Sequence, residues 1–555
     1  MEPRSLLGHL SHLFTRVLFP GETDTDSRLR WTSLLIVLLL PAAILYPSLG
    51  YHLLEPDEGR YAQISKEMLT NSSWVVPTLQ GESYLDKPPL MYWLVALSYK
   101  AFGVSPEAAR LVPAVCVHLT ILAVYLIGRR SLGERGAFWA ALLLSVAPGF
   151  VCIARMLLLD GLLTLCVTVS VLCGFEAVRT GKFKPGWWLA AAVASGLGFL
   201  TKGPISEVLL FVPLLAYALL TQNGGVGCRV SGVGETRTGM GDAPPEASPS
   251  PTPDIQRPTT IRVWWYLAFA LVVVAVNVPW YVAMYREQPQ FLGHFFWQHN
   301  VMRFLQPFDH LQPIWYYVPI LVGGLLPASL LLVLFARDLL RGDKSVARPT
   351  LAGGFWLLAG LWCVFFFSCS GSKLPTYILP AYPFLCLAAG EFVARTRWDK
   401  AISTRFVVAG MAGFVLLFHH VGLPWYAKER SPFGRPELVQ RFIENPQTPV
   451  MCFPRNCDSL AFYSDRADLR NVRTKDANKL IVECHHRPRT VILFTHRESL
   501  AGFKAILPPS LEIVEEVSLR RKHGHAILDK FAGSTPWGLC DVVVVEPRYQ
   551  VPPTE

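Results

Sequence analysis

Long apolar segments alternate with short polar ones between residues 31 and 422. Many of these segments approach the length of about 20 residues that an α-helix needs to cross a bilayer. We therefore predict a polytopic α-helical membrane protein with about 11 to 13 transmembrane helices. The clearest predicted spans cover 31–49, 107–128, 136–154, 158–178, 186–200, 204–221, 263–284, 314–336, 351–369, 375–393 and 403–422.

Composition and charge support this class and orient the chain. Of its 555 residues, 52% are hydrophobic and 17% are charged, which is too apolar for a soluble protein of this length. The net charge of +10 comes from Lys and Arg that gather in every second loop, as cytoplasmic loops do. The basic loops are 129–135, 179–184, 337–348 and 395–400. No basic stripe with interleaved aromatic residues is present, so nucleic acid is not an expected partner.

This orientation divides the chain into regions. Residues 1–30 are predicted to be a cytoplasmic N-terminal segment, and residues 31–424 a transmembrane domain. A Gly-, Pro- and Ser-rich stretch at 222–262 interrupts that domain and is predicted to be a disordered cytoplasmic linker. Residues 425–555 are more polar and are predicted to form a small soluble extracytoplasmic α/β domain. Its expected strands lie at 491–494 and 541–545, and its expected helices at 437–443 and 500–506.

Four cysteines of this polar region leave two interpretations open: Cys452, Cys457, Cys484 and Cys540. In an oxidising compartment they can form one or two disulfides. With His485 and His486 they can instead bind zinc, although their spacing matches no common zinc motif.

The first extracytoplasmic loop places acidic side chains beside the membrane. Glu55, Asp57 and Glu58 follow the first span, and Asp86 and Lys87 lie further along the same loop. Charged residues next to a bilayer are energetically unfavourable and are usually functional. The alternative is that Asp57 and Glu58 only complement the positive end of a helix.

A helix is expected to begin in this loop near Pro56, which suits a first turn because it lacks an N–H. Tyr61, Ile64 and Met68 then form an apolar stripe, with polar residues elsewhere around the helix. The pattern predicts a short amphipathic helix that lies on the membrane surface, and a second surface helix at 90–103.

Other polar residues fall on the same outer side. Asp160 and Lys202 lie at the outer ends of spans, and Lys373 and Tyr377 lie in the last outer loop. A long outer loop adds His294, His299, Arg303, Asp309, His310, Tyr316 and Tyr317. Each can singly be a helix cap, a snorkelling lysine or part of an aromatic belt. Their shared side favours a common cavity, because purely structural charges should occur on both faces.

Carboxylates and cations at the mouth of a membrane cavity fit the chemistry of a lipid-phosphate sugar donor. As the sugar leaves, negative charge on the phosphate rises, so Lys and Arg stabilise the transition state more than the ground state. A carboxylate can act as the base for the acceptor hydroxyl. Paired carboxylates can also hold a divalent metal, and Lys and Arg can neutralise a phosphate without one, so no cofactor is certain and a divalent metal stays possible.

Five motifs together resemble those of a known family. They are Glu55-Pro56-Asp57-Glu58-Gly59-Arg60-Tyr61, Tyr84-Leu85-Asp86-Lys87-Pro88, Leu159-Asp160, Thr201-Lys202-Gly203 and Lys373-Leu374-Pro375-Thr376-Tyr377. In this order they resemble the bacterial aminoarabinose lipid A transferases, which belong with the dolichyl-phosphate-mannose protein mannosyltransferases in the GT-C class. The resemblance implies an inverting hexosyl- or pentosyltransferase of the inner (plasma) membrane. Its donor would be a polyprenyl-phosphate sugar, and its acceptor a lipid, glycan or protein on the periplasmic, extracytoplasmic side.

The resemblance also implies roles for individual residues. Asp57, with Glu58 beside it, would handle the acceptor hydroxyl, and Asp160 would match the second essential carboxylate. Lys87, with Tyr84 and Tyr377, would surround the lipid phosphate. The substrate-binding set is completed by Asp86, Arg303 as a further phosphate cation, Tyr316, Tyr317 and Lys373.

A transporter or flippase of a polyprenyl-phosphate sugar is the alternative from another class. Transporters commonly place coupling charges near the bilayer midplane and contain internal repeats. Here the charges gather at one edge and no repeat is evident, which favours a transferase. A catalytically silent scaffold is a third possibility, against which the retained carboxylates, lysine and tyrosines argue. The sugar, the acceptor, the metal dependence and the oligomeric state stay open.

Overall fold

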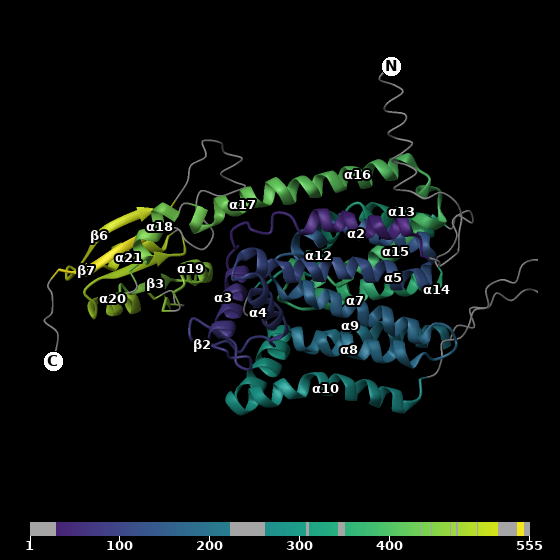
Figure 1. The fold of residues 1–555 in the computed structure, drawn as a ribbon, viewed down its shortest axis with the longest axis horizontal. Helices are drawn as coiled ribbons and strands as arrows, with labels where there is room; N and C mark the ends of the chain where they lie inside the picture. The colour runs from purple at the N-terminus through teal and green to yellow at the C-terminus, as the bar shows by residue number, and fades with distance from the viewer. Residues whose placement is uncertain are drawn as a thin grey trace, which may run out of the picture.

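The computed structural model describes residues 29–222, 261–306, 310–341, 350–434, 436–445, 447–466, 468–472, 476–496, 498–519 and 541–548. Most helices run along the long axis of the molecule, and a small sheet lies at one end (Figure 1). Helices α3 (Asp57–Thr70) and α4 (Leu90–Phe102) lie between the long helices of the bundle and the sheet. The predicted N-terminal segment and linker fall largely outside the described residues.

The membrane region is almost entirely helical. Its other helices are α2 (Trp31–Leu45), α5 (Pro106–Val146), α6 (Pro148–Ala154), α7 (Leu159–Val178), α8 (Pro185–Lys202), α9 (Ile205–Gln222), α10 (Val263–Glu287), α11 (Arg303–Leu305), α12 (Tyr317–Gly324), α13 (Ala328–Arg341), α14 (Leu351–Cys369), α15 (Ala381–Arg395), α16 (Ile402–Leu417) and α17 (Leu423–Arg430). A π-helix (Gly293–Met302) precedes α11, and strands β1 (Thr78–Leu79) and β2 (Glu82–Ser83) form a hairpin in the first loop.

The chain is a multi-pass membrane protein. Among the described residues, 5 helices are long and apolar enough to cross a bilayer, and a sixth candidate is a pair bent by 111° between α12 and α13. Other apolar helices, such as α2, are shorter. Helix α5 joins the predicted spans 107–128 and 136–154 across a break at Gly133, whose φ of 75° lies in the left-handed region. The predicted total of about 11 to 13 spans therefore has to include helices too short to cross the bilayer without bending or thinning it.

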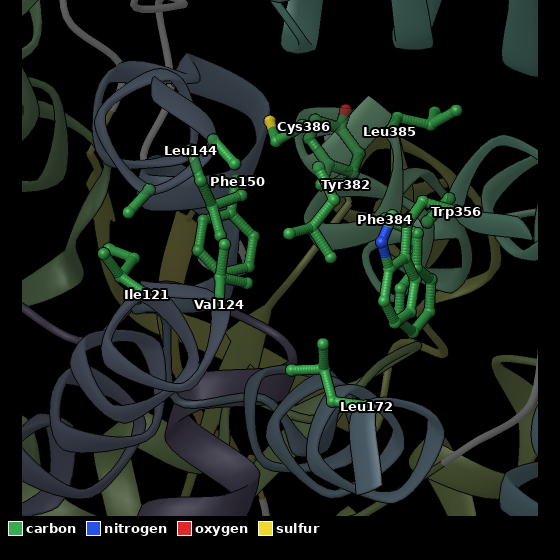
Figure 2. Close-up of a cluster of buried hydrophobic side chains, with 14 of the residues drawn as sticks. Ile121, Val124, Leu144, Phe150, Leu172, Trp356, Tyr382, Phe384, Leu385 and Cys386 are labelled. Carbon is green, nitrogen blue, oxygen red and sulfur yellow. The ribbon is translucent and has the colours of Figure 1, made fainter. Parts of the chain in front are cut away.

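Buried aliphatic and aromatic side chains fill the centre of the helical bundle. Figure 2 shows this cluster, to which α5, α6, α7, α14 and α15 contribute. The rings of Phe150 and Tyr382 stack with centroids 6.3 Å apart, and those of Trp356 and Phe384 with centroids 6.2 Å apart. Because lipid is as apolar as these side chains, close packing rather than escape from water holds the helices together.

Three of the four basic loops meet at one end of the bundle. Glu176 is 1% exposed and lies 3.3 Å from Arg130 and 3.9 Å from Lys184. Arg135 forms an ion pair with Asp399. These contacts join the loops at 129–135, 179–184 and 395–400, so their predicted common side is confirmed.

The C-terminal region contains a five-stranded sheet in the order β4-β3-β5-β7-β6. Its elements are α18 (Pro436–Ile443), β3 (Val450–Phe453), α19 (Asp458–Ser464), β4 (Arg470–Asn471), α20 (Asn478–His485), β5 (Thr490–Phe494), α21 (Ser499–Ile506), β6 (Leu511–Ser518) and β7 (Asp541–Pro547). Strand β3 runs parallel to β4 and β5, whereas β7 is antiparallel to β5 and β6. The four elements predicted from the sequence of this region are confirmed as α18, β5, α21 and β7.

Helix α19 covers the polar side of α3, which the sequence predicted only to lie on the membrane surface. Lys66 donates a hydrogen bond to the carbonyl of Phe462 at 3.0 Å and pairs with Asp465 at 2.7 Å. Gly59 permits this approach, since a Cβ there would lie 2.5 Å from the backbone nitrogen of Ser459. The periodicity identified the apolar side correctly, but nothing local in the sequence reveals a cover that comes from 400 residues away.

The predicted disulfides do not form among the described cysteines. Cys452, Cys457 and Cys484 are buried and free. Cys452 and Cys457 pack on one face of the sheet and Cys484 on the other, so the sheet separates them. No group of metal ligands includes them within the described ranges. Cys540 lies outside those ranges.

Candidate active site

Asp57 begins α3 and meets residues from three other parts of the chain. Its side chain is 41% exposed and accepts a hydrogen bond from Arg60 at 3.3 Å. Asp160, Lys202 and His310 lie within electrostatic range of its carboxyl group. Burial raises the pKa of Asp57, the Arg60 guanidinium opposes that rise, and Asp160 adds to it. A carboxylate with a raised pKa accepts a proton more readily.

Asp160 and Lys202 form an ion pair at the ends of two neighbouring helices. Asp160 lies in the first turn of α7 and Lys202 in the last turn of α8, which suits their charges to the helix dipoles. The Lys202 Nζ lies 2.5 Å from Asp160 Oδ1 and 4.6 Å from the centroid of the Tyr377 ring. Gly203, with a φ of 84°, ends α8 directly after the lysine. A carboxylate and an aromatic ring therefore fix the position of this ammonium group.

The segment from Tyr84 to Lys87 lies beside the start of α3. Tyr84 lies within electrostatic range of Arg60, and burial raises the pKa of Tyr84. Asp86 Oδ1 lies 3.3 Å from His294 Nε2, which joins this segment to the π-helix. Lys87 is half-buried in the same segment. The structure thus brings the motifs around Asp57, Tyr84, Asp160 and Tyr377 together.

Glu58 points away from this group into the protein. It is 1% exposed and accepts hydrogen bonds from Arg110 at 2.9 and 2.7 Å and from the backbone N–H groups of Leu54 and Leu157, both at 2.9 Å. Burial alone would raise its pKa, but the Arg110 charge and these hydrogen bonds lower it below the usual value. Glu58 therefore has the environment of a structural anchor, and no substrate contact follows from its placement.

The remaining predicted residues differ in how they are placed. Lys373 is 3% exposed and donates hydrogen bonds to the carbonyls of Gln312, at 3.0 Å, and Ser370. Through these hydrogen bonds Lys373 joins two outer loops. Tyr316 and Tyr317 pack with ring centroids 5.3 Å apart, and Tyr317 lies within electrostatic range of Asp160 and Tyr377. The side chains of His299 and Arg303, and the whole of Asp309, lie outside the described part of the chain.

Arg60 and Lys202 are the site residues that the predicted set left out. Both stand inside the recognised motifs, Arg60 three positions after Asp57 on the same helix and Lys202 before the glycine that ends α8. Their positions within these motifs could therefore have identified them as site residues. Asp458, whose Oδ2 lies 3.5 Å from Arg60, comes from α19 and had no such signal.

No group of three or more His, Cys, Asp or Glu side chains is placed to hold a metal ion among the residues that the structure describes. Asp57 forms an ion pair with Arg60, and Asp160 forms one with Lys202.

Glu55 ties the active-site loop to the C-terminal region. It is 5% exposed and accepts a hydrogen bond from the Ser459 N–H at 2.5 Å. Burial and the neighbouring Asp458 raise the pKa of Glu55 to about 8, against a usual value of 4.5. Between these two values the folded protein keeps a proton that the unfolded chain has lost.

This difference in proton binding predicts that stability falls as the pH rises from about 5 to about 8. The variant Glu55→Gln keeps an acceptor for the Ser459 N–H and removes the titration, so its unfolding temperature should fall less over this range. Thermal unfolding of both proteins in detergent at several pH values measures the two slopes. Equal slopes would contradict the assignment of this proton to Glu55.

Much of the chain is similar to known membrane glycosyltransferases. The family model for dolichyl-phosphate-mannose-protein mannosyltransferase matches residues 86–230. The undecaprenyl phosphate-alpha-4-amino-4-deoxy-L-arabinose arabinosyl transferase 2 of Pseudomonas fluorescens is 31% identical over 410 residues, which are 72% of this chain. The corresponding transferase of Edwardsiella ictaluri is 28% identical over 421 residues, which are 74% of this chain and 68% of that protein. The chain spans 63% of the length of the Pseudomonas relative.

The fold is also that of a solved structure. The crystal structure of ArnT from Cupriavidus metallidurans bound to undecaprenyl phosphate superposes with a TM-score of 0.66 at 19% sequence identity. The match covers 92% of this chain and 97% of that one.

Proposed function

Because this chain belongs to the GT-C family of membrane glycosyltransferases that includes the aminoarabinose transferases and the protein mannosyltransferases, we propose that it transfers a sugar from a polyprenyl phosphate to an acceptor hydroxyl. The observation that carries the proposal is the meeting of Asp57, with its raised pKa, and the Asp160–Lys202 ion pair. Asp57 supplies a base, and the Asp160–Lys202 pair holds a cation beside it. The relative from Pseudomonas fluorescens is named for an undecaprenyl phosphate amino-arabinose, which makes a pentose on undecaprenyl phosphate the first donor to test.

In the proposed reaction the acceptor oxygen attacks the anomeric carbon while Asp57 takes its proton. The bond between that carbon and the phosphate oxygen breaks, and the polyprenyl phosphate leaves with the bonding electrons. Lys202 is placed to stabilise the charge that grows on the phosphate, with Lys87 as a second candidate cation. Attack opposite the leaving group inverts the anomeric centre.

We place this site on the extracytoplasmic face of the inner membrane. The basic loops gather at a different part of the bundle from Asp57, and such loops are normally cytoplasmic. The C-terminal domain packs against α3, which carries Asp57, and belongs on the same side. A polyprenyl-phosphate donor and a lipid, glycan or protein acceptor would both reach the site there.

The proposed function is tested most simply through Lys202. Lys202→Ala is expected to lower the transfer rate by about a hundredfold, since one preorganised cation at the leaving group is lost. Lys202→Arg should recover part of the rate because it keeps the charge. Initial rates with a sugar-labelled undecaprenyl phosphate and purified protein give both values.

The matched control is Lys100→Ala, which removes an exposed lysine from α4. Its transfer rate should equal that of the wild type. A Lys202→Ala variant that keeps its fold and full activity would show that Lys202 does not stabilise the leaving phosphate.

A further inference from the structure

A crevice of about 1060 Å³ separates the active-site loop from the C-terminal sheet. Glu55, Pro56 and Arg60 line its side next to the membrane domain. The opposite side is formed by the segments that follow β3 and β5, by residues 476–478 before α20, and by one face of α21. Each wall therefore comes from a different part of the chain.

The topology of the sheet explains why a crevice opens here. From β3 the chain passes through α19 to β4 on one side, and then crosses to β5 on the other side of β3. Helix α19 packs on one face of the sheet and α21 on the opposite face, so the segments after β3 and β5 diverge. Ligands bind in open α/β sheets at such a switch point, outside the carboxyl ends of the strands.

A threonine holds the two diverging segments in place. The Thr495 hydroxyl accepts a hydrogen bond from the Arg455 N–H at 2.9 Å, and lies 3.2 Å from the carbonyl oxygen of Phe453, to which it can donate. Thr495 is 8% exposed. The edge of the crevice is therefore built by specific contacts, which favours a preformed site.

Glu55 lines the crevice and carries a buried oxygen that has no hydrogen-bond partner among the described residues. Its Oε2 makes no hydrogen bond, and the residue is 5% exposed. Buried polar atoms are normally hydrogen-bonded, so this oxygen marks a position that a ligand can satisfy. The raised pKa of Glu55 leaves it protonated at neutral pH, which lets it donate as well as accept.

The rest of the lining combines an apolar surface with donors and acceptors. Pro454, Ala477 and Ile506 provide the apolar surface, and Asn456 and Asn478 provide amide groups. Among the described lining residues, Arg60 and Arg455 are balanced by acidic side chains at Asp476 and Glu498. A surface of this kind suits an uncharged polyhydroxyl ligand better than a phosphate, which would require a cationic excess.

We propose that this crevice is an acceptor subsite that binds a sugar residue next to the one whose hydroxyl is attacked. The proposal rests on the proposed glycosyl transfer and adds that the acceptor carries a glycan. Arg60 connects the two places, because it pairs with Asp57 and also lines the crevice. A sugar in the crevice would position its neighbour at Asp57.

The substitution Gly502→Trp tests the subsite by filling it. Gly502 lies on the crevice face of α21, and a Cβ there meets no atom within 4 Å, so a side chain can begin at this position without a backbone shift. We expect the KM for the acceptor to rise at least tenfold, with the KM for the donor unchanged. The matched control is Ala501→Trp, which puts the same ring on an exposed position of α21 outside the crevice lining. Equal acceptor KM values for the two variants would overturn the proposal.

A binding measurement on the full chain separates this proposal from the transfer reaction itself. Two NMR experiments detect binding without any turnover. Saturation-transfer NMR is recorded with chitobiose, maltose and cellobiose, and phosphorus NMR with inorganic phosphate. We expect at least one disaccharide to bind to the wild type and to Ala501→Trp but not to Gly502→Trp. Binding of phosphate alone, or of no probe, would overturn the sugar subsite. If a disaccharide binds as expected but the protein shows no transfer activity, the proposed function is contradicted, whereas sugar binding in the crevice is supported.

Discussion

Replacing Asp57 by Asn is expected to lower the rate of sugar transfer by about a thousandfold, because a general base contributes roughly 10² to 10⁴ to the rate of such a step. Asparagine keeps the size of the side chain and can still accept a hydrogen bond from Arg60, but it cannot take the proton. Binding of the donor lipid should therefore persist. The comparison requires single-turnover rates and donor dissociation constants for the wild type and the variant.

Two further observations make the Asp57 prediction specific. The raised pKa of Asp57 means that the acid limb of the rate profile should lie above the usual aspartate value of 3.8, with activity falling as the carboxylate becomes protonated. Glu82→Gln, which removes an exposed carboxylate from the hairpin of the same loop, should leave both rate and profile unchanged. An Asp57→Asn variant that transfers sugar at the wild-type rate would eliminate Asp57 as the base.

Removing the buried partner of Arg110 is expected to produce the largest loss of stability. In Glu58→Ala, Arg110 keeps its charge at 0% exposure without its carboxylate, and the N–H groups of Leu54 and Leu157 lose their acceptor. Breaking one side of a buried ion pair destabilises a protein by about 3–5 kcal/mol. The midpoint of thermal unfolding and the yield of folded protein in detergent should both fall well below those of Asp57→Asn.

The double variant Glu58→Leu with Arg110→Met distinguishes a buried charge from a general packing defect. Replacing both partners by apolar side chains removes the uncompensated charge, so part of the lost stability should return. A double variant that is less stable than Glu58→Ala would show that Arg110 stabilises the loop through its own hydrogen bonds to the carbonyls of Leu49, Tyr51 and His52, and that its unpaired charge is not the main cause of the loss.

Local signals in the sequence were sufficient for much of the fold and the site. Apolar runs located α7, α10 and α14, and short continuous apolar runs located β5 and β7. Asp160 and Lys202 were both placed on the outer side because each stands at the outer end of a span, but only the structure shows that they form an ion pair. Charge counting also grouped the basic loops that meet around Glu176 and Asp399.

Contacts between distant segments account for what the sequence did not reveal. Glu58 resembles a catalytic partner of Asp57 in the sequence, but adjacent helical positions point in different directions, and only the structure shows Arg110 beneath it. The cover of α3 by α19 and the separation of the cysteines by the sheet depend on the same long-range packing. The crevice at Glu55 could not be predicted, because neither the membrane domain nor the C-terminal domain contains it alone.

The most direct test of the central claim follows the sugar itself. Purified protein in vesicles is given an undecaprenyl phosphate whose sugar and lipid carry different labels, together with a membrane extract as acceptor. We expect the sugar label to move to an acceptor while the lipid label is recovered as free undecaprenyl phosphate, and Asp57→Asn to prevent both. If the two labels stay together and only cross the bilayer, the protein transports the donor and is not a transferase.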